Sequence, residues 1–443
     1  MEKIGFVSLG CSKNLIDTEV MLGILRDKHM EITEDLAEAD IIIVNTCTFI
    51  EKAKQESIDT ILKAAAYKTE GHCQMLIVTG CLSQQYKEEL LKEMPEIDAL
   101  LGTGSWDRIW EAIDAVKQGR RACFMDNVSH LYDQTTSRLR TTPSYSAYVK
   151  IGEGCNNGCS FCIIPHVRGR LYSRPVDSVV AEVRQLAADG VKEINLIAQD
   201  TTSYGVDLAG HSLLPDLLRQ LVNIEGIRWI RLFYLYPHYF TDELMDLIIT
   251  EDKICPYVDL PLQHISQPVL QRMNRRDTED DVRRLVDKLC AHGRKLTLRS
   301  TFIVGFPGET EEEFQTLCDF VEQTKFDDVG VFTYSQEEGT PAAKMADQIP
   351  EDVKEERYHA LMAIQAKVSE QRNQELEGTL HTMLIEDVTE ENGHRQAVGR
   401  IEVQAPEVDG LTYLEEAGTV KPGDMVPVRI VQGFAYDLVA EQV

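Results

Sequence analysis

The segment Gly152-Glu-Gly-Cys155-Asn-Asn-Gly-Cys159-Ser-Phe-Cys162 carries three cysteines at the spacing C-x3-C-x2-C. It follows an apolar run, Tyr145 to Ile151, that has the pattern of a β-strand. Because the thiols are close in sequence and the glycines let the backbone turn tightly, the three sulfurs must face one small volume. Thiolates grouped in this way bind soft metal, either as an iron–sulfur cluster or as zinc.

Two metal sites are compatible with this loop. An iron–sulfur cube has more iron corners than three cysteines can fill, so one iron stays open and becomes a place for chemistry. A structural zinc ion would need a fourth ligand, and His166 follows Cys162 closely enough to supply one. The residues alone leave both alternatives open.

Length and composition restrict the class of protein. A chain of 443 residues is expected to form two to four domains. It contains no apolar run of membrane-spanning length, and its start has no signal-peptide layout, so we expect a cytoplasmic protein. Eleven cysteines then favour metal binding or reactive thiols over disulfides. The formal charge of −28 repels nucleic acid and attracts basic partners.

Residues 1–135 alternate between strand and helix patterns, which predicts a parallel sheet with helices on its faces. The expected strands are Ile4 to Leu9, Asp40 to Asn45, Met75 to Thr79 and Ile97 to Leu101. The expected helices are Leu15 to Lys28, Lys52 to Tyr67, Ser83 to Glu93 and Trp106 to Gln118.

One cysteine follows each of the first three of these strands, namely Cys11, Cys47 and Cys81. Ligands of open parallel sheets bind beyond the carboxyl ends of the strands, so these three thiols can converge. This predicts a second three-thiolate cluster site. The alternative is that each is a small buried apolar residue, as we expect for Cys73 and Cys123.

Residues 140–375 repeat the alternation with six strand–helix units, which predicts a partial TIM-type barrel with its site at the carboxyl ends of the strands. The expected strands are Tyr145 to Ile151, Glu193 to Ala198, Ile227 to Leu235, Tyr257 to Leu260, Thr297 to Val304 and Asp328 to Thr333. The expected helices are Val176 to Ala188, Leu213 to Asn223, Asp242 to Thr250, Thr278 to His292 and Glu311 to Thr324, with a linking helix from Pro350 to Glu377.

Polar residues at these strand ends are candidates to hold a cofactor or substrate, although each could equally form hydrogen bonds at the barrel rim. They are Gln199, Asp200, Gln263, His264 and Arg299. The turn after the cysteine loop, with His166, Arg168 and Arg170, could contact an anion but is more typical of a solvated turn. The remaining thiols, Cys255, Cys290 and Cys318, have the placement of packing residues.

Residues 378–443 have the period-two pattern of short strands, which predicts a small antiparallel β-barrel. The expected strands are His381 to Asp387, Gln396 to Ile401, Met425 to Val431 and Phe434 to Val439. This part has four basic residues against twelve acidic ones. RNA-binding modules are usually basic, so a basic protein surface is the better partner.

The three parts in this order resemble the methylthiotransferases of the radical S-adenosylmethionine (SAM) superfamily over essentially the whole chain. Those enzymes have an N-terminal cluster domain, a radical SAM barrel and a C-terminal TRAM barrel. The motifs that carry the resemblance are Leu9-Gly-Cys-Ser-Lys-Asn-Leu-Ile-Asp-Thr-Glu19, Asn45-Thr-Cys47, Thr79-Gly-Cys81, Cys155/Cys159/Cys162 with Phe161 in the aromatic slot, and Gly305-Phe-Pro-Gly-Glu-Thr310. Ser12 stands where proline is more usual in the family.

The resemblance implies two 4Fe-4S clusters and SAM as cofactors. Cys155, Cys159 and Cys162 would hold the cluster that cleaves SAM to a 5′-deoxyadenosyl radical, and Cys11, Cys47 and Cys81 the cluster that carries the sulfur. A second SAM would supply the methyl group. Phe161 would lie near the adenine, and Gln199, Gln263 and Arg299 are the expected SAM contacts. No side chain is assigned as catalytic, because the cofactor carries the radical chemistry.

The family has branches with different substrates. Gly10-Cys-Ser-Lys-Asn14 and Gln199-Asp-Thr-Thr-Ser-Tyr204 are more similar to the branch that methylthiolates the β-carbon of an aspartate in ribosomal protein twelve of the small subunit. The acidic last domain agrees with that basic substrate. The alternatives are a methylthiotransferase of tRNA adenosine and a non-enzymatic zinc or cluster scaffold. The expected partners also include an electron donor such as flavodoxin or ferredoxin and a sulfur donor, with no membrane.

Overall fold

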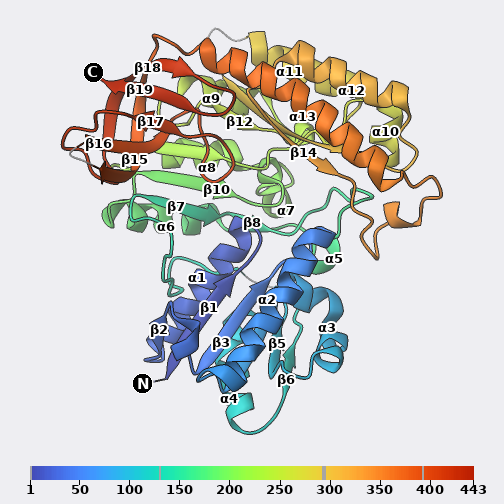
Figure 1. Ribbon diagram of the computed structural model, residues 1–443, viewed down its shortest axis with the longest axis vertical. Coiled ribbons are helices and arrows are strands. Elements are labelled where there is room, and N and C mark those ends of the chain that lie inside the picture. Colours follow the sequence, from blue (N-terminus) through green and yellow to red (C-terminus); the bar gives the residue numbers. More distant parts are fainter. Residues whose placement is uncertain (1, 129–130, 292–295, 392–393) are drawn as a thin grey trace.

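The protein is described here from a computed structural model that covers residues 2–128, 131–291, 296–391 and 394–443 (Figure 1). An N-terminal parallel sheet, a central curved sheet and a C-terminal barrel follow one another along the chain. Within the described ranges, no helix has the length and apolar character that crossing a membrane requires.

The N-terminal part is a six-stranded parallel sheet with the order β2-β1-β3-β4-β5-β6. Its strands are β1 (Lys3–Ser8), β2 (Glu31–Thr33), β3 (Ile41–Thr46), β4 (Met75–Gly80), β5 (Ala99–Leu101) and β6 (Ala122–Phe124). Its α-helices are α1 (Ser12–Asp27), α2 (Glu51–Glu70), α3 (Cys81–Glu93) and α4 (Ile109–Lys117). The predicted parallel sheet is confirmed, but the sequence analysis missed the edge strands β2 and β6, which are too short to show a periodic pattern.

The central part is an open barrel of parallel strands. Two three-stranded sheets, β11-β10-β7 and β12-β13-β14, are joined by a parallel bridge between Ile230 and Ile254. Its strands are β7 (Ser146–Lys150), β10 (Glu193–Ile197), β11 (Trp229–Leu232), β12 (Tyr257–Asp259), β13 (Thr297–Val304) and β14 (Asp328–Thr333). This confirms the predicted partial TIM-type barrel with six strand–helix units.

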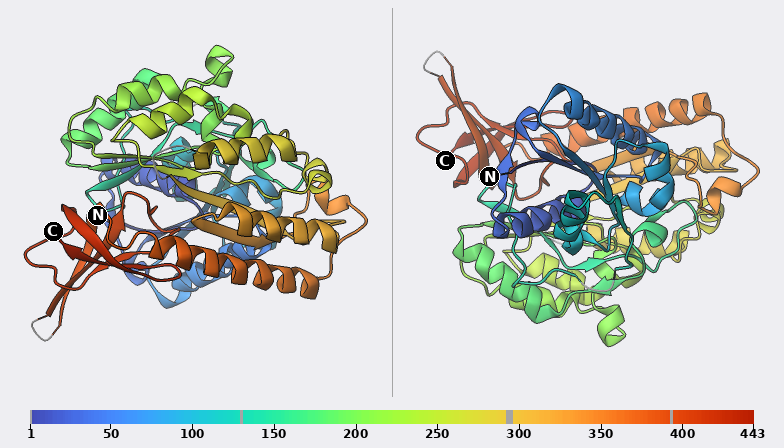
Figure 2. Two further views of the ribbon diagram at one scale, coloured as in Figure 1. Left: turned by 90° about the horizontal axis from the view of Figure 1, so that it is seen from above. Right: turned by 90° about the horizontal axis from the view of Figure 1, so that it is seen from below.

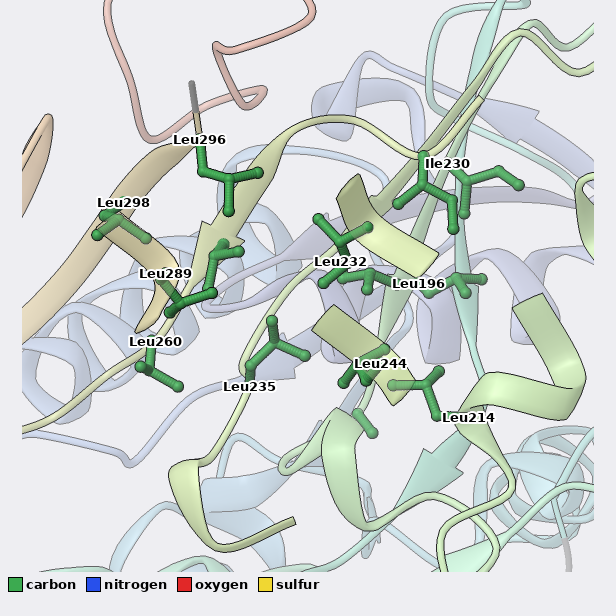
Figure 3. Close-up of a cluster of buried hydrophobic side chains, with 14 of the residues drawn as sticks. Leu196, Leu214, Ile230, Leu232, Leu235, Leu244, Leu260, Leu289, Leu296 and Leu298 are labelled. Atoms are coloured by element: carbon green, nitrogen blue, oxygen red, sulfur yellow. The ribbon is translucent and has the colours of Figure 1, made fainter. Parts of the chain in front are cut away.

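Helices cover the outer side of this curved sheet, and the N-terminal part lies against one end of it (Figure 2). The helices on the outer side are α6 (Val176–Ala188), α8 (Leu214–Leu221), α9 (Asp242–Thr250), α11 (Glu279–Ala291) and α12 (Glu311–Thr324). Buried leucines and isoleucines pack between the curved sheet and these helices, and Leu196, Leu232 and Leu244 are examples (Figure 3). Of the predicted helix from Thr278 to His292, the last residue lies outside the described ranges.

Helix α13 (Glu351–Gln374) leads from the central barrel to a closed C-terminal barrel of order β15-β16-β17-β19-β18. Its strands are β15 (Leu380–Glu391), β16 (His394–Ile401), β17 (Thr412–Leu414), β18 (Met425–Gly433) and β19 (Leu438–Gln442). The pairing of β17 with β19 is parallel, whereas the sequence analysis expected antiparallel pairing throughout and did not identify β17. The four other pairs that close this barrel are antiparallel.

Candidate functional site

The first cysteine loop leaves β7 through the two-residue strand β8 (Gly152–Glu153) and ends at the short helix α5 (Ile164–Val167). The Cys162 amide donates to the Cys159 carbonyl at 3.1 Å, which closes the loop. Burial is the largest cause of a rise in the pKa of Cys155 to about 11 and in that of Cys162 to about 12, and charge on Cys159 contributes to both rises. Buried thiols whose ionisation is opposed in this way fit a site in which a bound cationic cluster would stabilise the thiolates of Cys155 and Cys162.

A polar segment after helix α10 (Gln267–Arg272) holds this loop in place. Asn274 Nδ2 donates to the Gly158 carbonyl at 2.8 Å, and Arg276 Nη2 donates to the Asn156 carbonyl at 2.9 Å. Arg275 Nη1 lies 3.8 Å from the Cys159 sulfur. The sequence analysis missed this segment because it follows a short helix rather than a strand end.

The second set of cysteines comes from three neighbouring strands of the N-terminal sheet. Cys11 precedes α1, Cys47 follows β3, and Cys81 is the first residue of α3, directly after β4. Burial is the largest cause of a rise in the pKa of Cys81 to about 12. Arg168 opposes this rise, whereas charge on Cys11 and Cys47 contributes to it, so the three thiols lie within electrostatic range of one another. The backbone at Gly10 approaches Cys47 so closely that a Cβ there would lie 3.0 Å from its sulfur.

Within the described ranges, no three His, Cys, Asp or Glu side chains are close enough to bind one metal ion together. His166, the proposed fourth zinc ligand, is exposed on α5. A cube-shaped cluster differs from a single ion because each thiolate binds a separate iron corner. Each cysteine set therefore offers three separate thiolates, the donor set of a cluster with one open iron corner.

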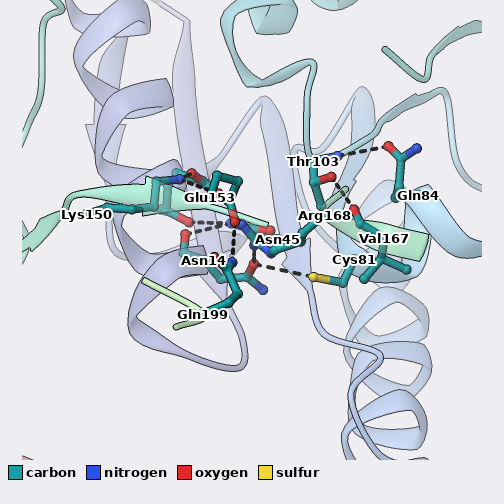
Figure 4. A network of polar contacts seen from close by, with 12 residues as sticks. Asn14, Asn45, Cys81, Gln84, Thr103, Lys150, Glu153, Val167, Arg168 and Gln199 are labelled. Carbon is teal, nitrogen blue, oxygen red and sulfur yellow. Dashed lines mark hydrogen bonds and ion pairs between the residues drawn. The ribbon is translucent and has the colours of Figure 1, made fainter. Parts of the chain in front are cut away.

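A buried ionic network lies between the N-terminal sheet and the barrel, and it reaches Cys81 through the contact of Arg168 with Asn14 (Figure 4). Arg168 Nη1 contacts Asp17 Oδ2 at 3.1 Å and Glu153 Oε2 at 2.8 Å, and Lys150 Nζ contacts Glu153 Oε2 at 2.8 Å and also Asp17. Burial alone would raise the pKa of Glu153, but Arg168 and Lys150 lower it to about 2. The two cations and two carboxylates balance, which is what permits their burial. Arg168 is 1% exposed, so its expected place in a solvated turn was wrong.

The same interface brings Cys81 next to the first cysteine loop. Cys81 packs with Ile163, which directly follows Cys162, and with Val167. The Thr103 hydroxyl donates to the Val167 carbonyl, and Arg168 Nη2 contacts Asn14. The N-terminal sheet thus meets the barrel at the carboxyl ends of its strands, where both cysteine sets lie.

Lys13 and Tyr234 lie between the N-terminal sheet and the barrel. The Lys13 ammonium is 2.9 Å from the centre of the Tyr234 ring, and burial lowers the pKa of Lys13 to about 8, although charge on Cys11 opposes this fall. Tyr234 follows β11 and has φ +57°, a left-handed conformation that is uncommon for a bulky residue and is typical of functional sites. Neither residue belongs to a sequence pattern that predicts a role for it.

The four predicted SAM contacts lie at carboxyl strand ends or in the barrel interior. Phe161 is half-buried, with its ring 6.4 Å from that of Phe306 in an edge-on arrangement. Gln199 donates to Glu153, and its own buried Oε1 has no partner among the described residues. Gln263 has φ +73°. Arg299 already pairs with Asp259 at 3.0 Å and Asp409 at 3.3 Å. Their roles toward SAM stay predictions.

The structure defines the surroundings of three other residues that the sequence singled out. His264 is fully buried with Nε2 3.7 Å from Glu309 Oε2, and burial lowers its pKa to about 3. Asp200 accepts a hydrogen bond from Asn157 at 2.7 Å and so positions the cysteine loop. Cys290 is exposed and is not a packing residue.

Comparison with family models assigns each part of the chain. Residues 3–102 match the uncharacterized protein family UPF0004, residues 149–321 the radical SAM superfamily, and residues 378–443 the TRAM domain. Among solved structures, the chain is similar to a radical S-adenosylmethionine methyltransferase, TsrM, from Kitasatospora setae, with a TM-score of 0.56 and 17% identity over 77% of each chain. That similarity concerns the fold alone.

Full-length relatives are much more similar in sequence. The ribosomal protein uS12 methylthiotransferase RimO of Geotalea uraniireducens is 52% identical, over 99% of this chain and 98% of its own. The proteins of the same name from Geobacter sulfurreducens and Desulforamulus reducens are 52% and 48% identical, over 99% and 100% of this chain and 98% and 99% of their own. At this identity and coverage, the chain belongs to the RimO family of radical SAM methylthiotransferases.

Proposed function

We propose that the protein adds a methylthio group to the β-carbon of an aspartate in ribosomal protein uS12, the small-subunit protein twelve. The observation that carries this proposal is the meeting of two cysteine sets at one buried interface, where Cys81 packs against Ile163. One set would serve radical formation and the other sulfur delivery. Because the substrate is a ribosomal protein, we place the reaction in the cytoplasm.

The two sets would each hold one 4Fe-4S cluster, with Cys155, Cys159 and Cys162 in the first set and Cys11, Cys47 and Cys81 in the second. When bound, the clusters and SAM supply the electron, the radical that removes hydrogen from carbon, the sulfur and the methyl group. Within the protein, Arg275 lies beside Cys159, and Asn274 holds the loop backbone. The unpartnered Oε1 of Gln199 offers a hydrogen-bond acceptor for SAM.

The buried network would fix the distance between radical and sulfur sites. Arg168 and Lys150 come from the barrel, whereas Asp17 comes from α1 of the N-terminal sheet. A buried network with paired charges holds its members in one geometry more strictly than apolar packing does. Catalysis at a substrate carbon depends on such positioning, because small displacements cost large factors in rate.

The acidic C-terminal barrel is the proposed docking part for the substrate. It carries twelve acidic and four basic residues, and a basic ribosomal protein would be attracted to it. A flavodoxin or ferredoxin would supply electrons, and a separate donor would supply sulfur.

The test is product analysis under anaerobic conditions with SAM, reductant and sulfide. Ribosomal protein uS12 and tRNA with a prenylated adenosine are offered in parallel. We expect a mass gain that corresponds to S–CH3 on uS12, located on aspartate by fragmentation. A gain on tRNA alone would assign the protein to adenosine modification, and zinc without iron after anaerobic purification would indicate a scaffold instead of an enzyme.

A further inference from the structure

The cations around the two cysteine sets differ in whether their charge is already neutralised. Lys150 and Arg168 share Asp17 and Glu153. The other cations of this region are engaged too. Arg299 pairs with Asp259 and Asp409, and Arg275 lies against Cys159, the Pro261 carbonyl and the Tyr236 ring.

Lys13 differs from Lys150, Arg168 and Arg299 because it has no carboxylate partner among the described residues, and the group whose charge acts on it most strongly is the Cys11 thiol two residues away. Lys13 is 5% exposed, and its Nζ lies within ion-pair distance (4.0 Å) of no carboxylate of the described residues. Its contact is with the Tyr234 ring, 2.9 Å from the ring centre. A buried ammonium normally has an anionic partner, because its desolvation is costly.

The nearest carboxylates cannot become that partner without losing other contacts. Asp259 accepts from the Tyr234 amide at 2.9 Å and pairs with Arg299. Glu153 accepts from Lys150, Arg168 and Gln199. The donor hydrogens of the Lys13 ammonium that do not face the Tyr234 ring are therefore available to an anion that enters from outside.

Lys13 also has the right position for such an anion. It is two residues from Cys11 in the second cysteine set, and it reaches the loop after β11 at the carboxyl end of the barrel. In an aspartate, the β-carbon is bonded directly to the carboxyl carbon. A substrate whose β-carbon reaches the space between the cysteine sets must bring its carboxylate there as well. Thiolates and acidic side chains would repel it unless a cation compensates.

We propose that the Lys13 ammonium binds the side-chain carboxylate of the substrate aspartate and thereby selects an acidic residue for modification. This inference rests on the proposed function. It makes Lys13 a residue of substrate specificity, with Tyr234 as the aromatic support that keeps the ammonium extended toward the substrate.

The experiment is a double-mutant cycle on binding, with the reconstituted, SAM-loaded enzyme. Wild type and Lys13→Met are each titrated with uS12 and with uS12 whose target aspartate is replaced by asparagine. Methionine keeps the length and packing of lysine without the charge. Lys63→Met, an exposed position on α2, is the matched control.

We expect Lys13→Met to raise the Kd for uS12 on the order of 100-fold, because one partner of a buried charge pair is lost. On the asparagine substrate, the same change should have an effect below about threefold, because the pair is already broken. Iron content, the electron paramagnetic resonance spectrum and substrate-free SAM cleavage should remain within about twofold of wild type.

Three results would overturn the inference. Equal effects of Lys13→Met on both substrates would show that Lys13 does not meet the carboxylate. If Lys13→Met binds uS12 and its asparagine variant as tightly as the wild type does, Lys13 takes no part in substrate binding. Loss of iron from the variant would assign Lys13 to cluster binding. If wild type binds and modifies uS12, any of these leaves the proposed function intact, whereas a wild type that fails to modify uS12 refutes both proposals.

Discussion

At the scale of single residues, buried charge distinguishes positions that look alike in the sequence. Arg168 and Arg170 stand in one turn, yet Arg168 is buried against Asp17 and Glu153 while Arg170 is exposed. Removing the first arginine would leave two buried carboxylates with Lys150 alone. Removing the second would leave no buried charge unpaired.

We therefore expect Arg168→Met to lower the free energy of unfolding by about 3–5 kcal/mol, the usual cost of breaking a buried ion pair. Arg170→Met should change it by less than about 0.5 kcal/mol. Urea unfolding of the metal-free protein measures both without interference from cluster loss. Equal stabilities of the two variants would contradict the buried network.

The two cysteine sets should also separate in function. Cys159→Ala should abolish 5′-deoxyadenosine formation, because the radical-forming cluster loses a ligand. Cys47→Ala should retain it but yield no methylthio product. The measurements are chromatography of 5′-deoxyadenosine and mass spectrometry of uS12, with the exposed Cys290→Ala as control. Loss of both activities in a folded Cys47→Ala protein would argue against two independent clusters.

At the scale of elements, the junction between β4 and α3 decides where Cys81 lies. Gly80 has φ +97°, and a Cβ there would lie 2.3 Å from Asn45 Oδ1 and 2.5 Å from the Thr46 carbonyl oxygen. The glycine thus allows the strand to turn directly into the helix that begins with Cys81.

We expect Gly80→Ala to destabilise the metal-free protein by about 3 kcal/mol, because backbone strain and steric overlap add. Gly119→Ala is the matched control. It also has positive φ, at +76°, but open space around the added Cβ, so it should cost only about 1 kcal/mol. Urea unfolding measures the stability of both variants. If Gly80→Ala lost less free energy of unfolding than Gly119→Ala, the steric argument would be refuted.

At the scale of the whole molecule, Glu193 joins the central and C-terminal barrels. Its carboxylate pairs with Arg400 of β16 at 2.7 Å and with Arg231 of β11 at 3.3 Å, all of them buried. Burial opposes the charge, but the two arginines outweigh it and lower the pKa of Glu193 to about 2. In the folded protein, Glu193 therefore takes up a proton only at a pH below the range in which glutamates ordinarily titrate.

Because its folded pKa lies below its unfolded pKa, Glu193 stabilises the protein above about pH 4.5 and loses this contribution as pH falls toward about 2. The free energy of unfolding of the wild type should exceed that of Glu193→Gln by about 3 kcal/mol at pH 7. The difference should shrink below about pH 4.5 in urea unfolding. Glu322→Gln, exposed on α12, is the matched control and should change the free energy of unfolding by less than about 0.5 kcal/mol at pH 7. A difference that is constant with pH would contradict the ion-pair assignment.

Much of the fold was predictable because it depends on local patterns. The buried strands β3 and β4 appear as continuous apolar runs, and α6 and α12 begin and end where the pattern predicts. Short elements such as β2, β6 and β17 were not predictable, because three residues show no period and only their neighbours make them strands.

The sequence by itself determined the three-part architecture and the six cysteines proposed as cluster ligands, because spacing within a loop and position after a strand are local properties. Only the tertiary structure decided that Arg168 is buried with Asp17, that Lys13 reaches Tyr234, and that Arg299 pairs with Asp409. These partners are more than a hundred residues apart in the chain. Their contacts depend on how folded parts dock, which no local pattern encodes.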